Sequence, residues 1–398
     1  MSATSLAGLF ICNLVVFSYG NGFVPLLPLY AENLGANGEM AGYCIALSYA
    51  CLAAGTFLAG RLSDSGMGRR ALLAATGLLA APLLWLLASV TTIWQLVLVN
   101  GSHWFLMGAC LSVVGTIAGR EARARNRGTV FGILGTTIAV GSLVGGVTMG
   151  RMVDAWGYSR MFLVAAGSML LIPLASAVAV RETTAGPRHH DDPKTVTMAP
   201  VVTGGLLLLV FAEILTMLSV GEGNLGRSLQ MSGASFASSA ITMTAAVGGI
   251  ATLPLPFVLG RLSDRIGRGA VIMVSPVAGA GSLLLLLVSH ALWQFLAVGV
   301  LNSLSAVSIS VGPALVADVV RRERVGTGIS IFQASIWVGM ILGFSFSGIA
   351  FQRLGPRTAL LLGALSAIVA VPLILVIRAG RRTAPGTSLP GGVVQDPR

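Results

Sequence analysis

The sequence predicts an all-α membrane protein with twelve transmembrane helices arranged as two related bundles of six. Three observations predict this fold class: the composition, the length of the apolar blocks and an internal repeat. Of the 398 residues, 55% are hydrophobic and only 10% are charged, whereas soluble domains carry about 25% charged residues. Too few charges therefore remain to cover a surface that faces water.

The apolar residues occur in blocks of about 20, the length at which a helix crosses about 30 Å of hydrocarbon. Short charged or Gly/Pro-containing segments separate the blocks. In lipid the backbone must satisfy its own hydrogen bonds, so continuous blocks of this kind form helices. Twelve blocks are recognised, with centres near Phe17, Ala50, Leu79, Phe105, Ile138, Ser168, Leu215, Val247, Leu283, Ser305, Met340 and Ala367.

An internal repeat divides the chain into two halves. Gly60-Arg-Leu-Ser-Asp64 recurs as Gly260-Arg-Leu-Ser-Asp264, at an offset of 200. Trp94-Gln95 recurs at an offset of 199, and Gly128-Thr129 and Gly157 recur at an offset of 198. We therefore predict an N-terminal bundle over residues 1–181, a polar cytoplasmic linker over 182–199, a C-terminal bundle over 200–378 and a disordered cytoplasmic tail over 379–398.

The net charge of +11 is distributed as in a membrane protein. Twenty of the 25 lysines and arginines fall in the loops after the even-numbered blocks or in the tail. This is the positive-inside pattern with both termini cytoplasmic, so we expect no nucleic-acid partner. The first block reads as a retained helix and not as a signal peptide. The opposite loops hold the other five, Arg151, Arg160, Arg227, Arg353 and Arg357.

No constellation of residues indicates an enzyme, a metal site or a cofactor. Cys12, Cys44, Cys51 and Cys110 all lie inside apolar blocks without metal-ligand spacing. His189-His190 in the linker has no second ligand cluster, so a solvated linker is the preferred interpretation.

The repeated loop carries a family resemblance. Gly60 to Asp64 with Gly68-Arg69-Arg70, and Gly260 to Asp264 with Arg265-Ile-Gly267-Arg268, resemble the signature loop of the major facilitator superfamily. The resemblance covers about residues 5–378. It implies two six-helix bundles and alternating access around a midplane site.

These loops are predicted to form a gate at the cytoplasmic side. A glycine allows close helix approach, and an aspartate can sit at a helix N-terminus. Arginines that only set the topology are the alternative, which leaves the repeated Gly and Asp unexplained. The gate candidates are Gly60, Asp64, Arg69, Arg70, Gly260, Asp264, Arg265 and Arg268, with Glu121 and Asp318 as their partners.

A second motif lies in the fifth block. Gly141-Ser-Leu-Val-Gly145-Gly146 resembles the antiporter motif of the drug:proton antiporter branch, with Ser142 where that branch has proline. The resemblance implies efflux. Generic packing of small residues is the alternative.

Polar side chains inside the spans are candidates for function, because each is costly in hydrocarbon unless it is paired or faces a cavity. Glu213 is predicted near the middle of its span, and desolvation there would favour proton uptake and release. His103 also has chemistry suited to proton handling. For both residues, a hydrogen-bonded interior side chain without a role in transport remains the alternative.

The resemblance further implies that helices one, four, seven and ten line a central cavity. It nominates as lining Asn13, Asn21, Asn100, His103, Trp104, Glu213, Glu222 and Asn302. Gln333 and Trp337 of helix eleven are further candidates, and packing or anchoring at the membrane interface is the alternative for the tryptophan.

The function these features favour is proton-coupled efflux of small amphipathic or cationic compounds by alternating access. Proton-coupled import of a sugar or other small metabolite is one alternative. A membrane sensor or lipid-handling protein that does not transport is another. We expect a monomer in a bacterial inner membrane, with protons, a small-molecule substrate and the lipid bilayer as its partners.

Overall fold

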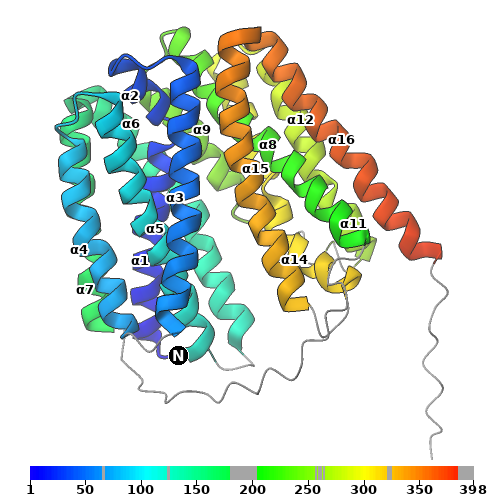
Figure 1. The fold of residues 1–398 in the computed structure, drawn as a ribbon, viewed down its shortest axis with the longest axis horizontal. Helices are drawn as coiled ribbons and strands as arrows, with labels where there is room; N and C mark the ends of the chain where they lie inside the picture. Colours follow the sequence, from blue (N-terminus) through cyan, green and yellow to red (C-terminus); the bar gives the residue numbers. More distant parts are fainter. Residues whose placement is uncertain are drawn as a thin grey trace, which may run out of the picture.

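The computed structural model describes residues 1–383 apart from 65–67, 123–125, 180–203, 256–257, 259–261, 263–264 and 321–324. The described part is almost entirely helical, in two groups of long helices that stand side by side (Figure 1). The predicted linker and most of the predicted tail lie outside the described residues. The helix α16 (Pro356–Thr383) continues beyond the predicted boundary at residue 378.

The N-terminal half contains six membrane crossings. Its helix α6 has a break at Gly157, where φ is 79° and ψ is 171°, a backbone conformation that glycine tolerates. Both legs of α6 run beside α1, since Gly145 faces Gly22 and the Phe162 ring contacts Phe23. The elements are α1 (Ala3–Phe23), α2 (Leu27–Asn33), α3 (Gly38–Asp64), α4 (Arg69–Leu87), α5 (Ile93–Glu121), α6 (Arg127–Met169) and α7 (Leu171–Ala179).

The C-terminal half repeats this arrangement. Ten stretches of the described residues are long and apolar enough to cross a membrane. One of them, Thr129–Val178, includes both legs of α6, and α9 is described over only 15 residues. Twelve crossings agree with this pattern. The remaining elements are α8 (Gly204–Gly233), α9 (Ser238–Thr252), α11 (Arg268–Ile272), α12 (Val274–Leu286), α13 (Leu292–Leu304), α14 (Val307–Val319), α15 (Val325–Leu354) and α16.

One local expectation was wrong, and another needs a detail added. The tenth block is confirmed as one apolar stretch, Leu292–Ala317, and a break between α13 and α14 lies at its predicted centre, Ser305. There the Ala306 amide donates to the Ser303 carbonyl at 3.2 Å. This tight turn interrupts the regular series of α-helical backbone hydrogen bonds. Arg227 is not in a loop. It lies inside α8, is 2% exposed, and donates through Nη2 to Asn224 Oδ1 at 3.1 Å.

The molecule has two distinct ends (Figure 1). We call the end that holds Met1 and residue 383 the linker end. The opposite end carries the turns at Gly35, Gly157, Ser235 and Gly355, where φ lies between 59° and 83°, and we call it the turn end.

Candidate functional site

The two halves meet near the turn end through two helix crossings that the internal repeat relates. In the first, α3 crosses α15: a Cβ on Gly42 would lie 2.9 Å from the Cα of Gly348. In the second, α9 crosses α6: a Cβ on Gly150 would lie 2.5 Å from the Ser238 carbonyl oxygen. Gly348 and Gly150 differ by the repeat offset of 198. Small residues thus let both pairs of backbones approach closely.

A carboxylate at the second crossing joins the halves. Asp154 of α6 accepts hydrogen bonds from the backbone amides of Ser238 and Ser239, both at 2.9 Å. These amides form the N-terminus of α9, where unpaired N–H groups and the helix dipole favour a negative charge. Gln352, at the repeat position related to Asp154, places its Oε1 beside Gly38 at the start of α3. The related positions thus both lie beside the start of a helix of the other half, but within the described part of the chain only Asp154 forms hydrogen bonds with its amides.

Two further polar contacts link the halves at this end. Arg353 of α15 forms an ion pair with Glu39 of α3, with Nη2 and Oε1 3.1 Å apart. Ser232 of α8 donates to Glu32 Oε2 of α2 at 3.4 Å. Burial raises the pKa of the Glu32 carboxyl, and the hydrogen bond from Ser232 partly opposes this shift. Together with the crossings, these contacts close the turn end.

The exposure of one face of α15 falls steadily toward the turn end. Gln333 is exposed and Trp337 is half-buried, whereas Met340 is 7% and Phe344 0% exposed. These residues follow one another along one helix face, so this face of α15 becomes more buried toward the turn end.

Four aromatic side chains meet where this face of α15 is buried against α3. We call them the aromatic cluster: Tyr49, Trp104, Trp337 and Phe344. The ring of Tyr49 stacks on Phe344 with a centroid distance of 5.2 Å and an interplanar angle of 23°. The Trp104 ring lies 5.2 Å and the Trp337 ring 6.2 Å from Tyr49. Trp104 and Trp337, two predicted lining residues from different halves, thus both contact the ring of Tyr49, which the sequence analysis did not identify.

Glu213 lies inside the C-terminal half. It is 3% exposed, and its Oε1 accepts from the Ser308 hydroxyl of α14 at 2.8 Å. The Ser308 amide in turn donates to Ser275 Oγ at 2.8 Å. The predicted carboxylate therefore contacts a neighbouring helix of its own half. Asn13, at the related repeat position, is 9% exposed.

Glu222 and Asn302 also lie within the C-terminal half. Glu222 is 0% exposed and packs against Gly363 of α16. Neither of its oxygens has a hydrogen-bond partner within the part of the chain that the structure describes. Asn302 donates to Asn224 Oδ1 at 3.0 Å. The structure thus does not place Glu222 in a space shared with the N-terminal half.

The polar candidates of the N-terminal half are similarly internal. His103 is 0% exposed, and its ring meets the Tyr19 ring edge-on at 4.6 Å. Asn100 donates to Ser48 Oγ of α3 at 2.7 Å. Asn21 donates to Ser142 Oγ of α6 at 2.7 Å. These contacts join helices of one half, although Asn100 Oδ1 and both ring nitrogens of His103 have no hydrogen-bond partner within the described part of the chain.

The described gate candidates make contacts within the N-terminal half. Arg69 donates through Nη2 to the Ser63 carbonyl at 3.3 Å, and Arg70 to the Ala177 carbonyl. Glu121 accepts from the Ser5 hydroxyl at 2.8 Å. A Cβ on Gly60 would lie 3.4 Å from Ser112 Oγ, and Arg265 is exposed. Outside the described residues lie Gly260, Asp264 and the side chains of Asp64, Arg268 and Asp318.

The glycines of the fifth block pack on two sides. A Cβ on Gly141 would lie 2.7 Å from Phe17 Cβ, and one on Gly145 would lie 3.0 Å from the Gly22 nitrogen. Both positions face α1. A Cβ on Gly146 would lie 2.7 Å from the Thr242 carbonyl oxygen of α9. The motif therefore packs within its half and also against the other half.

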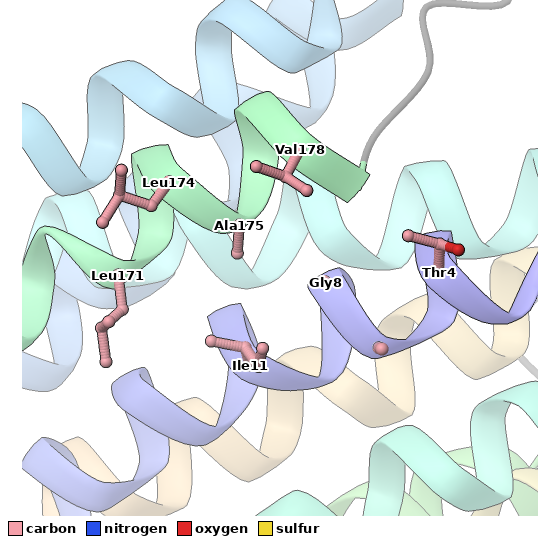
Figure 2. A pocket seen from close by; sticks show the side chains of 8 residues that line it. Thr4, Gly8, Ile11, Leu171, Leu174, Ala175 and Val178 are labelled. Carbon is pink, nitrogen blue, oxygen red and sulfur yellow. The ribbon is translucent and has the colours of Figure 1, made fainter.

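An apolar groove of about 330 Å³ lies between α1 and α7, away from the predicted site residues (Figure 2). Several of its side chains are exposed, including Leu174 at 60% and Val178 at 80%. Such a lining is typical of a helix surface that faces lipid.

Sequence reasoning missed Tyr49, Phe344, Asp154 and the pair Glu39–Arg353. For Asp154 the sequence offers one indication, which is its place three residues before Gly157, a glycine that the internal repeat also has. No pattern in the sequence pairs Tyr49 with Phe344, because they are far apart along the chain.

The family model of the Major Facilitator Superfamily matches this chain twice, over residues 9–221 and 202–395. The chain belongs to the major facilitator superfamily. This superfamily member is a multi-pass membrane protein, as its apolar helices also indicate.

Named relatives and solved structures resemble this superfamily member. It is 27% identical to the multidrug resistance protein MdtG of Klebsiella pneumoniae (strain 342) over 269 residues, and 26% identical to MdtG of Escherichia coli (strain K12 / DH10B) over 270 residues. The aligned part spans 63% of this chain and 63–64% of the relatives. The nucleoside transporter NupG superposes with a TM-score of 0.77 at 15% identity, over 95% of this chain and 99% of NupG. A POT family transporter superposes with a TM-score of 0.78 at 14% identity, over 95% and 96%.

Proposed function

We propose that this transporter exports small amphipathic or cationic compounds in exchange for protons, by alternating access. The similarity to relatives named multidrug resistance proteins supports the substrate class and the direction. We also propose that the protein acts as a monomer in a bacterial inner membrane. The excess of arginine in the loops of the linker end favours a cytoplasmic location for that end and for both termini.

The observation that carries the proposal is that the halves are in contact at the turn end, while the exposure of the facing side of α15 increases toward the linker end. Gln333 is exposed, while Phe344, on the same face of α15, is buried against Tyr49 of the other half. With the linker end in the cytoplasm, this is a state open to the inside. Separation of the two crossings would open the opposite side.

Glu213 is the proposed proton carrier. A carboxyl group buried against Ser308 in a span is strongly disfavoured as an anion, so it is held neutral until water or a cation reaches it. A change in the packing of α8 against α14 would alter that environment. Proton release is thereby linked to the conformational cycle.

Proteoliposomes with a trapped pH dye and an imposed proton gradient test the proposal. Addition of a lipophilic cation should dissipate the gradient with the wild type. Glu213→Gln, which cannot ionise, should abolish this response, and Glu213→Asp should retain part of it. Equal proton-dependent transport by the wild type and Glu213→Gln would contradict the role of Glu213. Compound accumulation that increases with an inwardly directed proton gradient, in proteoliposomes of known orientation, would instead indicate import.

A further inference from the structure

We propose that the apolar groove between α1 and α7 holds one acyl chain of a phospholipid with an anionic head group. The groove has a volume of about 330 Å³, and both helices that line it belong to the N-terminal half. It lies apart from the contacts that close the turn end. The ligand is a lipid and not the transported compound, so this site stands independently of the proposed function.

The length and depth of the groove fit one chain in one leaflet. Its lining runs from Thr4 to Ile11 and from Leu171 to Val178, which is about 10 Å along each helix at 1.5 Å per residue. Because α1 runs away from the linker end and α7 runs toward it, Thr4 and Val178 lie at the mouth (Figure 2). One leaflet is about 15 Å of hydrocarbon deep, whereas a spanning helix needs about 30 Å of contact. The groove therefore suits an acyl chain better than a transmembrane helix of a partner.

The lining has the shape and polarity that a lipid chain requires. Gly8 is buried and Ala175 is half-buried, so they form the floor, while the side chains of Ile11 and Leu171 are exposed beside them. Thr4, at the mouth, carries the only polar side chain of the lining. An acyl chain forms no hydrogen bonds, and the ester that joins it to the head group can accept one from the Thr4 hydroxyl.

The internal repeat shows that the fold does not require this groove. The Gly-x-Gly pattern near the end of α1 recurs in α8 at an offset of 201, and at this offset Gly8 corresponds to Leu209. At the offset of 198, Ala175 corresponds to Leu373. Leu209 is buried and Leu373 is half-buried. Large side chains thus occupy the related floor positions of the C-terminal half, and the N-terminal half leaves space there.

A cation lies at the mouth of the groove. Arg70, at the start of α4, donates through Nη2 to the carbonyl of Ala177, the residue before Val178. Its other guanidinium N–H groups have no hydrogen-bond partner within the described part of the chain, and the side chain is only half-buried. A guanidinium binds phosphate oxygens well, and basic residues at this depth attract anionic head groups. The charge at the mouth therefore complements an anionic phospholipid.

Photo-cross-linking in lipid nanodiscs tests the site with the full-length protein. The probe is a phosphatidylglycerol that carries a diazirine on one acyl chain, and mass spectrometry of peptides locates the adducts. In the wild type, residues 4–11 and 171–178 should carry more adducts than the exposed face of α4 at Leu78 and Leu79.

Filling the groove should reduce these adducts. Ala175→Leu, which supplies the side chain found in the C-terminal half, should lower them by about fourfold to fifteenfold, as expected when one or two methylene groups of the lipid lose their burial. Ala7→Leu, at an exposed lining position, should act in the same direction. Ala177→Leu is the matched control, since it makes the same change two residues along the same helix at an exposed position outside the lining.

The head group is tested with a phosphatidylcholine that carries the same chain. Arg70→Gln should lower the phosphatidylglycerol adducts by about fivefold, toward the phosphatidylcholine level, and leave the latter unchanged. The proposal is overturned if wild-type adducts are spread evenly over the exposed helix faces, or if Ala175→Leu and Ala7→Leu both label like Ala177→Leu. Equal labelling of the groove by the two lipids would overturn the anionic preference. A disulfide between two Val178→Cys molecules in native membranes would place a second copy in the groove and also overturn the proposal.

Discussion

Asp154 and Gln352 occupy related positions of the internal repeat, one at the contact of α6 with α9 and the other at the contact of α15 with α3. Both lie beside the start of a helix in the other half: Asp154 at α9, and Gln352 with its Oε1 near Gly38 of α3. Only Asp154 carries a charge, and it accepts two backbone hydrogen bonds. Because an anion at a helix N-terminus is stabilised by the unpaired N–H groups and the dipole, we expect the α6–α9 contact to contribute more to closure than its counterpart.

Asp154→Asn should shift the equilibrium away from the closed turn end. The loss of the charge corresponds to about 0.3–1 kcal/mol, or up to about a fivefold change in the ratio of closed to open molecules. Distances between spin labels at Ser89 and His290, in exposed turns of the two halves, would report the shift. Gln352→Ala should change the distribution less. The opposite ranking would show that the charge at α9 is unimportant.

We expect Glu32 to make closure depend on pH. Glu32 is an exposed residue, and the partial burial of its carboxyl raises the pKa, against the opposing effect of the Ser232 hydroxyl. The closed state therefore binds a proton at Glu32 more tightly than the open state does. The stabilisation that this proton gives to the closed state is fully present below the ordinary pKa and is lost as pH rises through the raised pKa. The same labels should show more closed molecules as pH falls from 7 to about 4.5. Glu32→Gln should reduce this dependence, and an unchanged pH profile would rule out Glu32 as its source.

At the scale of elements, the two crossings depend on the absence of side chains. Gly348 offers no room for one, because its Cβ would lie 2.8 Å from the Gly38 carbonyl oxygen and 3.0 Å from the Cα of Gly42. Backbone atoms cannot move aside as a flexible side chain can. The packing of α3 on α15 is consequently possible only with glycine at this point.

Gly348→Leu should prevent closure of the turn end and abolish transport, while the protein remains folded. Spin-label distances across the turn end should lengthen, and the melting temperature of the detergent-solubilised protein should change little. Gly135→Leu is the matched control, since nothing lies within 4 Å of a Cβ at that position. Normal transport by Gly348→Leu would mean that tight packing at α3–α15 is not required for the cycle.

The ion pair between Glu39 and Arg353 belongs to the same elements but should matter less. The Arg353 side chain is 67% exposed, so solvent screens the pair. Arg353→Gln should change the closed fraction by less than about threefold, and added salt should remove even this effect. A larger, salt-independent change in the spin-label distances would contradict this ranking.

At the scale of the whole molecule, the distribution of arginine predicts the orientation in the membrane. His290→Cys at the turn end should react with an impermeant maleimide in intact cells. Arg265→Cys should react only after permeabilisation. Three of the four native cysteines are buried and the fourth is half-buried, so background labelling should be low. The reverse pattern would invert the proposed topology.

The sequence by itself determined the class, the twelve crossings, the two related halves and the family. These features depend on composition, block length and repetition, which are properties of contiguous residues. The same reasoning identified Glu213 as a buried carboxylate and the glycines of the fifth block as packing positions. It placed Arg227 in a loop and did not predict the break at Ser305. Apolar content does not reveal where the hydrogen bonds of a helix are interrupted, or which polar side chain a neighbouring helix covers.

Only the tertiary structure decided how the halves meet. It joined Tyr49 to Phe344 and Asp154 to the start of α9, pairs that are distant in sequence. It also turned Glu222 toward Gly363 within its own half. The physical reason lies in the close contacts between glycines and backbone atoms of the other half. These contacts set where two helices cross, and the crossing position decides which side chains meet. A repeat predicts that two such crossings exist, but only packing determines that one of them is lined with rings and the other with small residues.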